Sequence, residues 1–450
     1  MTMLKVLVDP IDAHTSKAFV SKKLLEHLGN VEKTLIRCGA EAASLTIEAF
    51  EAKTLQMRCS STLLKQLHLP VQKQHLLFSI YDGELIVAPV ITILTEVYTQ
   101  EERPYFGSIH AFCEEFFHYC QREGIFFYVC TTDSSKQGSE EWQGYVCTEE
   151  GNWELTLVPR PHIVHNRIHS RKRERSEEFK QFVHVLEEQQ IPYFNGHYLN
   201  KWEVYEGLSS VVHLHPHLPK TYQLSSKDTL IDVLANHPTV FIKPIHGSQG
   251  RNIFKVAQND HAYVLDYTTF QQALNKEYAS FYDLFHSLYH HLKKQGFIVQ
   301  EAIELKTDQH GRPFDFRLLC HRNKQGLWKV TSSVARISSE HTFVSNLAQG
   351  GAQLNALQLL KDLYDEKTAL HLLLLMRELA LDICQELSTN QSKIFGEFGI
   401  DLALDQEGHP WIIEVNTKPS KQLYQEANKV RPSTKALLEY CLYLFQASNR

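Results

Sequence analysis

The stretch that decides the fold is GEFGIDLALDQEGHPWIIEVNTKPSK, residues 396–421. Apolar residues alternate with acidic or polar ones on both sides of the letters QEGH, which predicts a hairpin of strands 398–405 and 410–416. Glu414 and Asn416 are two apart in one strand, so their side chains point to one face, and Asp401 lies on the facing strand. Three oxygen donors on one face suit a hard cation such as Mg²⁺, and the alternative is a solvated face of an edge hairpin.

Immediately before this hairpin, the sequence predicts two more antiparallel strands and a long helical region. DFRLLCHR (315–322) and LWKVTSSVARI (327–337) have strand composition and pair plausibly across the turn at residues 323–326. Asp315 and Arg317 share one face, either as a salt-bridged pair or with the arginine free to bind phosphate. Residues 354–387 are strongly helical, as one long helix or two.

Further upstream, Lys243 lies in the predicted strand TVFIKP (239–244). A lysine within a buried strand needs an anionic partner, because an unpaired buried charge is costly. The loop that follows holds Gly247, Ser248 and Gly250, and glycines let backbone N–H groups approach phosphates closely. The P-loop pattern GxxxxGK[ST] is absent, and an ordinary hairpin turn with a solvated lysine is the alternative.

A third strand, FIVQEAIEL (297–305), places Gln300, Glu301 and Glu304 among apolar residues. The backbone of such a strand can bind an adenine edge, and a carboxylate that follows can accept hydrogen bonds from ribose hydroxyls. A strand with one polar face would explain the same pattern.

The first two hundred residues predict two further units. Residues 1–100 are β-rich, with strand candidates at 54–59, 76–81 and 84–93 and a short helix at 60–67. In residues 101–197 a helix at 112–123, with Gly124 as its C-cap, precedes a buried strand at 125–130. A strand at 162–168 and a helix at 176–190, with Ser176 as N-cap, follow. This alternation predicts an α/β domain with a parallel sheet.

Composition excludes several classes of protein. The net charge of −6 argues against binding nucleic acid through bulk charge. We expect no secretory signal and no membrane span, because the apolar runs are short and interrupted. Nine scattered cysteines without a CxxC spacing favour reduced thiols in the cytoplasm. The cluster HLHPHL (213–218) contains an HxH pair that could bind zinc, although Pro216 interrupts it. The basic run RKRER (171–175) is either a solvated loop or a contact for an acidic substrate or nucleic acid.

The order of these motifs resembles the ATP-grasp fold: a lysine strand, a glycine loop, the QEAI strand, the DFR strand and a final D…ExN hairpin. HYLNKWEVYEGL (197–208) is similar to the segment that carries a first ATP lysine, here Lys201. VARISSEHTFVSNLAQGG (334–351) is similar to the arginine-to-asparagine segment of ATP-grasp amino-acid ligases, with matches at Arg336, Asn346 and Gly350. Phrases such as HNRI (165–168), FIKPIHGSQGRNI (241–253) and APVITILT (88–95) resemble the YheC/YheD family of endospore coat-associated ATP-grasp proteins.

This resemblance implies an α/β architecture of three parts: an N-terminal β-rich domain (1–100), a pre-ATP-grasp α/β domain (101–197) and an ATP-grasp domain (198–450) whose two subdomains hold ATP between them. The site residues that it implies are of three kinds. ATP would be bound by Lys201, Lys243, Gly247, Ser248, Gly250, Gln300, Glu301, Ile303 and Glu304. The catalytic residues would be Arg317 and Arg336. Magnesium would be held by Asp401, Glu414 and Asn416.

The activity that the resemblance implies is an ATP-dependent ligation through an acylphosphate, with release of ADP and phosphate. The partners would be ATP, Mg²⁺ and a small-molecule or peptide carboxylate, in a cytoplasmic protein associated with the spore or its coat. Two alternatives stay open, a non-catalytic ATP-binding protein of the spore coat and a small-molecule kinase. Lys418 departs from the small residue that many amino-acid ligases have there, and Arg251 and Asn252 replace a second glycine pair.

Overall fold

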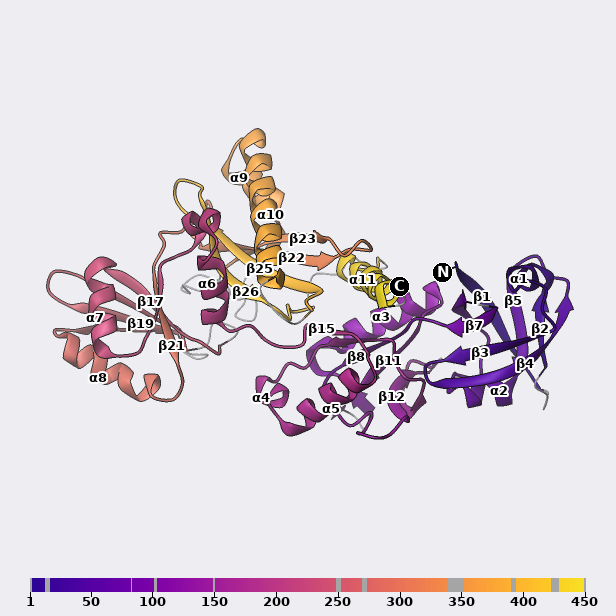
Figure 1. The fold of residues 1–450 in the computed structure, drawn as a ribbon. Coiled ribbons are helices and arrows are strands. Elements are labelled where there is room, and N and C mark those ends of the chain that lie inside the picture. Colours follow the sequence, from indigo (N-terminus) through magenta and orange to yellow (C-terminus); the bar gives the residue numbers. More distant parts are fainter. Residues whose placement is uncertain are drawn as a thin grey trace.

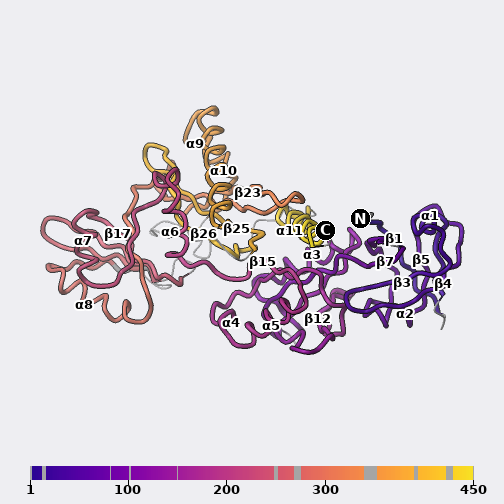
Figure 2. Tube along the Cα trace, viewed as in Figure 1, coloured from indigo at the N-terminus to yellow at the C-terminus, as the bar shows by residue number. Residues whose placement is uncertain are grey.

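The computed structural model describes residues 2–12, 17–81, 83–100, 103–148, 150–247, 252–268, 273–338, 352–389, 394–421 and 429–448. These residues form an elongated molecule, with a β-barrel at one end and the sheet of residues 221–301 at the other (Figure 1). The trace in Figure 2 shows that the C-terminal helix returns to the middle of the molecule, near the N-terminus. There Gln446 contacts the sulfur of Met3.

The N-terminal unit is a closed barrel of seven strands, β1 to β7. Around the barrel the order is β1 (Thr2–Ile11), β5 (Gln56–Ser60), β2 (Lys17–Ser21), β4 (Glu41–Phe50), β3 (Lys33–Cys38), β7 (Glu84–Val87) and β6 (Gln74–Tyr81). Alternate residues such as Val6 and Val8 are buried inside the barrel, as the two-residue period of a strand requires. Two short helices, α1 (Lys22–His27) and α2 (Ser61–Gln66), pack against it. The strands predicted at residues 54–59 and 76–81 and the helix predicted at 60–67 are confirmed.

The second unit is a six-stranded sheet between two helical layers. Its order is β13 (Trp153–Val158), β12 (Trp142–Cys147), β11 (Phe126–Cys130), β8 (Val90–Leu94), β14 (Ile163–Asn166) and β15 (Tyr193–Phe194). The prediction of a parallel sheet holds for the last four strands, but β12 and β13 form an antiparallel hairpin on its edge. Antiparallel strands can be joined by a short turn and need no crossover helix. The alternation of strands and helices in the sequence therefore did not predict this hairpin.

The helices of this unit have the predicted caps. Helix α3 (His110–Glu123) ends at Gly124, which has a left-handed φ of 80°. Helix α5 (Glu177–Glu188) begins after Ser176, whose side chain accepts a hydrogen bond from the Phe179 N–H. Short elements connect the strands and helices of this unit. They are β9 (Tyr98–Gln100), β10 (Arg103–Tyr105), η1 (Gly107–Ile109) and α4 (Arg171–Glu174).

The remaining chain forms two facing sheets. One has the order β16 (Thr221–Gln223), β21 (Phe297–Glu301), β17 (Thr239–Pro244), β18 (Phe254–Gln258), β19 (Tyr263–Thr268) and β20 (Ala273–Tyr278), with α7 (Lys227–Asn236) and α8 (Phe281–Leu292) over one face. The other has the order β24 (Ala352–Asn355), β23 (Trp328–Ile337), β22 (Phe314–Arg322), β25 (Glu397–Leu404) and β26 (Pro410–Asn416). The predicted pairing of residues 315–322 with 327–337 and the predicted final hairpin are both confirmed.

Helices complete this C-terminal half. The helical region at 354–387 is two helices, α9 (Ala356–Leu363) and α10 (Glu366–Thr389), which share a core with the five-stranded sheet and with α6 (Lys201–Ser209). The segment η2 (Val212–His217) follows α6. The last helix, α11 (Pro432–Ser448), packs on α3 of the second unit (Figure 1). All nine cysteines are buried and unpaired. Within the described residues, no helix combines the length and apolar character that a membrane crossing requires.

Candidate functional site

A cavity of about 810 Å³ lies between the β16–β21 sheet and the β22–β26 sheet, and we call it the inter-sheet cavity. Strands β17, β21, β22, β25 and β26 and the start of α6 all contribute to its walls. Its polar lining includes Lys201, Lys243, Gln300, Glu301, Asp315, Arg317, Arg336, Asp401, Glu414 and Asn416. Its apolar lining includes Phe241, Ile298, Ile303, Leu305 and Ile412. The lining thus offers apolar surface for a flat ring and charged groups for an ionic ligand.

Lys243 reaches the cavity from β17, which pairs with β21. Its ammonium donates a 2.5 Å hydrogen bond to the Gln300 side-chain oxygen, and the Gln300 amide donates to the Thr221 hydroxyl at 2.9 Å. Burial lowers the pKa of Lys243 to about 8, and repulsion from Lys201 contributes in the same direction. Glu414 partly offsets this effect, but no carboxylate of the described residues forms an ion pair with Lys243, and an anionic ligand would supply that charge.

Lys201 enters the cavity from the first position of α6. The Asn200 side chain caps this helix by accepting hydrogen bonds from the N–H groups of Trp202 and Glu203, and the Glu203 carboxylate accepts from the Asn200 N–H. The ammonium of Lys201 donates to Glu414 Oε1 at 2.8 Å and to the Gly247 carbonyl at 3.0 Å. The cap thus holds a cation between the final hairpin and the glycine loop.

Asp401 and Glu414 are direct cross-strand neighbours in the β25–β26 hairpin, with a bulge immediately after Asp401. Both Asp401 oxygens accept hydrogen bonds from the Arg317 guanidinium. Burial alone would raise the pKa of both carboxyls, but Arg317 holds that of Asp401 low and Lys201 that of Glu414. Both carboxylates are therefore ionised and neutralised by cations of the chain itself.

Arg336 joins this hairpin to the adjacent strands. Its guanidinium donates two 2.6 Å hydrogen bonds to Asp315 and lies 3.0 Å from Asp401 Oδ2. Burial works against its charge, but Asp401 and Asp315 together outweigh burial and raise the pKa of Arg336. Asn416 lies opposite Gly399 at the open end of the hairpin, and its buried side-chain nitrogen has no hydrogen-bond partner among the residues that the structure describes. Such an orphaned polar group marks a place where a ligand completes the hydrogen bonding.

The predicted adenine and ribose residues are only partly brought together. Glu301 and Ile303 line the cavity, but the Glu301 carboxylate accepts from the Lys220 N–H at 2.6 Å and lies 3.1 Å from His237 Nδ1. Glu304 is exposed and does not contribute to the cavity wall, although its neighbours Ile303 and Leu305 do. Gly247 lines the cavity, whereas Ser248, Gly250, Arg251, Asn346 and Gly350 lie outside the described residues.

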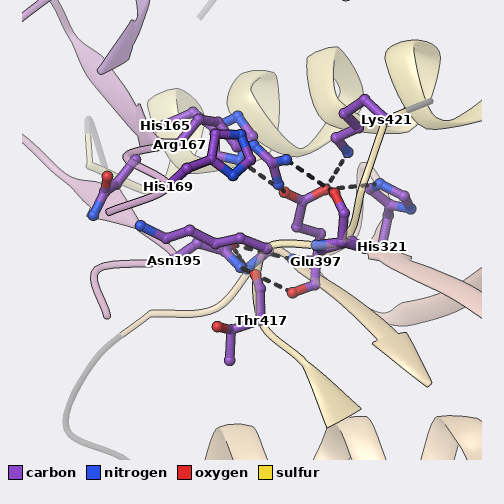
Figure 3. Close-up of polar contacts among 12 residues, drawn as sticks. His165, Arg167, His169, Asn195, His321, Glu397, Thr417 and Lys421 are labelled. Atoms are coloured by element: carbon purple, nitrogen blue, oxygen red, sulfur yellow. Dashed lines mark hydrogen bonds and ion pairs between the residues drawn. The ribbon is translucent and has the colours of Figure 1, made fainter. Parts of the chain in front are cut away.

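Sequence reasoning missed a second charge cluster, centred on Glu397 at the start of β25 (Figure 3). One Glu397 oxygen accepts from Arg167 at 2.6 Å and lies 3.1 Å from His165, and the other contacts Lys421 and His321. All five side chains are buried. Burial alone would raise the pKa of Glu397, but Lys421 and Arg167 hold it well below its usual range. The signal was an arginine in the apolar strand HIVHNRI, which needs a buried acid just as Lys243 needs an anion.

This cluster fastens the end of the hairpin to the second unit. Arg167 also donates to the Pro419 carbonyl at 2.9 Å, and the Asn195 amide donates to the carbonyls of Glu397 and Thr417. Lys418, noted above as a departure, contacts Glu174 and donates to the Ile168 carbonyl at 3.1 Å. The segment that follows Asn416 is therefore tied to β14 and α4, which closes the cavity on that side.

Comparison with known proteins places these features in a family. The family described as "YheC/D like ATP-grasp" matches residues 190–444. Endospore coat-associated protein YheD of Bacillus subtilis (strain 168) is 28% identical over 382 residues, which are 82% of this chain and 81% of YheD. Endospore coat-associated protein YheC of the same strain is 22% identical over 304 residues, 66% of this chain and 82% of YheC.

Among solved structures, the VanG D-Ala:D-Ser ligase from Enterococcus faecalis aligns with a TM-score of 0.48 at 14% identity, over 80% of this chain and 99% of that chain. D-cycloserine synthetase DcsG aligns with a TM-score of 0.45 at 15% identity, over 78% of this chain and 99% of the synthetase chain. The family match spans more than half of the chain and contains every predicted site residue. With the lysine strand, the DFR strand and the final hairpin arranged around one cavity, this chain belongs to the YheC/D-like ATP-grasp family.

Proposed function

We propose that this protein binds ATP with Mg²⁺ in the inter-sheet cavity and uses it to join a carboxylate to an amine. The observation that carries the proposal is the convergence of Lys201, Lys243 and Arg317 on one cavity that also contains the Asp401–Glu414 pair. Among the described residues, six lysines and arginines line this cavity against four aspartates and glutamates, and the surplus of positive charge suits the phosphates of a nucleotide. In this proposal the phosphates contact Lys201, Lys243 and Arg317, and adenine packs against apolar lining residues that include Ile303.

The donor set of the hairpin fits Mg²⁺. Asp401, Glu414 and Asn416 offer hard oxygen ligands, and Glu414 keeps one oxygen beyond the one bound to Lys201. The Asn416 side-chain nitrogen, which has no partner among the described residues, is a donor and suits an acceptor such as a phosphate oxygen, while its oxygen would face the metal. When bound, Mg²⁺ would screen the negative charge of the phosphates during transfer.

In the proposed reaction a substrate carboxylate oxygen attacks the γ-phosphorus, and the bond between that phosphorus and the bridging oxygen breaks. ADP leaves and an acylphosphate remains. An amine then attacks the acyl carbon, loses its proton, and releases phosphate. Arg317 and Arg336 are the cations that stabilise the transferring phosphoryl group, and the walls of the cavity hold the reactants in place.

The first test is nucleotide binding. We expect ATP with Mg²⁺ to raise the melting temperature, because a ligand at 100 times its Kd stabilises a folded protein by about 2.7 kcal/mol. Titration calorimetry gives the affinity directly. Folded protein that binds no ATP at millimolar concentration rules the proposal out.

The second test identifies the products. A ligase of this kind releases ADP and phosphate, because the bond that breaks is the one to the γ-phosphate. Incubation with amino acids and small dicarboxylates, followed by chromatography of the nucleotides, should yield ADP only when both acceptor and amine are present. Formation of AMP rejects the acylphosphate route, and a stable phosphorylated product indicates a kinase.

The names of the two relatives indicate where in the cell or spore this protein acts. Because YheD and YheC are described as endospore coat-associated, we infer that this chain also acts in or on the spore coat. A tagged full-length chain that is absent from purified spore coats of its source organism would contradict that inference.

A further inference from the structure

A second cavity, of about 1130 Å³, lies at the carboxyl ends of the parallel strands in the second unit, and we call it the strand-end cavity. Thr95 and Glu96 follow β8, Thr131 follows β11, and Ile168 follows β14 by two residues. None of the residues to which the ATP-grasp resemblance assigns a role lines it.

The position of this cavity is a topological switch point. Ile91 and Ile93 of β8 share a core with α3, whereas Val90 and Leu94 share a core with α5 on the other face. The chain therefore leaves β8 toward one face and leaves β14 toward the other. Ligands of open α/β sheets bind in the crevice that this reversal creates at the carboxyl ends of the strands.

The walls of the strand-end cavity carry arginines without carboxylate partners. Arg171 donates to the Gly247 carbonyl at 3.4 Å, Arg173 to the Thr132 hydroxyl at 3.4 Å, and Arg175 lies 3.1 Å from His246 Nε2. Within the described part of the chain, none of the three forms an ion pair with a carboxylate. In the inter-sheet cavity, by contrast, Arg317 and Arg336 both bind acids.

Acidic residues near these arginines have other contacts or lie in solvent. The Glu96 carboxylate accepts hydrogen bonds at 3.0 Å from the N–H groups of His169 and Ser170, which fixes the loop that begins α4. Glu178 lies in the first turn of α5, and Asp133 is exposed. A hydrogen bond from Ser176, with a contribution from Arg173, lowers the pKa of the exposed Glu178, but none of the three guanidinium groups is within ion-pair distance of a carboxylate in the described residues. They therefore remain for an external anion, and a guanidinium binds carboxylates and phosphates through paired N–H groups.

The same cavity has an apolar wall. Val97, Tyr98, Tyr145 and Leu155 contribute to its lining, and Tyr98 and Leu155 leave 56% and 55% of their surfaces exposed. This wall combines exposed apolar side chains with arginines, and the combination suits an organic anion. The acid group of such a ligand would bind the arginines, and its apolar body would pack on the rings.

The two cavities adjoin each other, because Arg171 and His246 line both. We propose that the strand-end cavity is the acceptor site of the enzyme, and that it binds an organic anion through Arg171, Arg173 and Arg175 with its apolar body on Tyr98, Tyr145 and Leu155. This proposal rests on the proposed ligase function, for which a second, non-nucleotide substrate site is necessary. Burial, reinforced by Arg175, lowers the pKa of His246, so that its neutral ring can accept a hydrogen bond from Arg175.

The test measures binding of three probes to the full chain by calorimetry: 4-phenylbutyrate, phenyl phosphate and the neutral 4-phenylbutanamide. We expect at least one of the two anions to bind at least tenfold more tightly than the amide. The better of the two anions identifies the acid group as carboxylate or phosphate. If neither anion binds more tightly than the amide, the proposal is wrong.

Variants locate the binding. Arg173→Gln with Arg175→Gln should weaken the anion at least tenfold, whereas Lys136→Gln with Lys180→Gln removes the same charge from exposed positions outside the cavity and should leave the affinity unchanged. Tyr98→Ser should weaken phenyl phosphate more than inorganic phosphate. Equal effects of both double variants would mean that the anion responds only to overall charge, which overturns the proposal.

Nucleotide binding is measured in the same samples. ATP with Mg²⁺ should bind the Arg173→Gln, Arg175→Gln variant as it binds the wild type, because neither arginine lines the inter-sheet cavity. A wild-type chain that binds the anion but no ATP would refute the proposed function and leave the anion site standing. A chain that binds ATP but no anion would refute the acceptor site alone.

Discussion

Lys243 shows at the scale of one residue how the cavity is prepared for a charged ligand. Its pKa of about 8 lies below the value near 10.5 of an unfolded chain, so between these pH values the unfolded chain binds more protons. Stability without nucleotide should therefore rise with pH across that window, by at most about 1.4 kcal/mol per pH unit for this group. Lys418 and Lys421 have pKa values lowered in the same way and share the effect.

We expect Lys243→Met to remove part of that rise and to leave the nucleotide-free protein at least as stable as the wild type at pH 7. ATP affinity should fall about 10- to 100-fold, the value of a charged hydrogen bond worth about 1.5–3 kcal/mol. Wild-type affinity should also weaken between pH 7 and 9.5, as Lys243 loses its proton. Denaturation and calorimetry across this pH range measure both, with exposed Lys227→Met as control. A destabilised variant with unchanged ATP affinity would make Lys243 structural.

Replacing each of the two hairpin carboxylates by its neutral amide should change the stability of the protein to different extents. Glu414→Gln should change the stability of the nucleotide-free protein by about 1 kcal/mol or less, because the Glu414 side chain is 30% exposed and its ion pair is screened. Asp401→Asn should cost about 3–5 kcal/mol, since it leaves Arg317 and Arg336, whose side chains are only 12% and 13% exposed, without their shared acid. Both variants should lose the stabilisation by ATP that depends on Mg²⁺.

Thermal melts with and without ATP and Mg²⁺ separate these effects. Two carboxylates this close would repel each other if no cation lay between them. In the structure Arg317, Arg336 and Lys201 already balance them, so metal binding must share the carboxylates with protein cations. If Glu414→Gln unfolds the chain easily yet keeps the full ATP shift, the metal assignment is wrong.

At the scale of elements, the caps of two helices offer a matched pair. Asn200 caps α6, whose first residue is the cavity lysine Lys201, and Ser226 caps α7, which contributes no residue to the cavity. Either alanine substitution should cost about 1 kcal/mol of stability. Only Asn200→Ala should also weaken ATP binding, by up to about tenfold, because it releases the turn that positions Lys201. Equal ATP affinity in the two variants would show that the cap does not position the lysine.

At the scale of the whole molecule, the Glu397 cluster joins the second unit to the five-stranded sheet. Glu397→Gln leaves Arg167 and Lys421 buried without their acid, and should cost about 3–5 kcal/mol in chemical denaturation. The pKa of Glu397 is depressed, so the stability that it contributes is present above about pH 4.5 and is lost as the pH falls further. The exposed barrel pair Arg37–Glu84 is the control, and Glu84→Gln should cost about 1 kcal/mol at most. A similar loss in both variants would contradict a joining role.

The sequence by itself determined the elements that carry the site. The alternation of the β25–β26 hairpin and the lysine in β17 are both local patterns, because backbone periodicity depends on residues within a few positions of each other. The order of these elements along the chain then sufficed to predict an ATP-grasp fold.

Only the tertiary structure decided which charges neutralise each other. Arg317 meets Asp401 across 84 positions of sequence, Lys201 meets Glu414 across 213 and Arg167 meets Glu397 across 230. The basic run at 171–175, which looks like a solvated loop in sequence, lines a cavity because β8 and β14 send the chain to opposite faces of one sheet. Ion pairs and cavities depend on distances in space, and a chain pattern carries no information about them until long-range strand pairing brings the residues together.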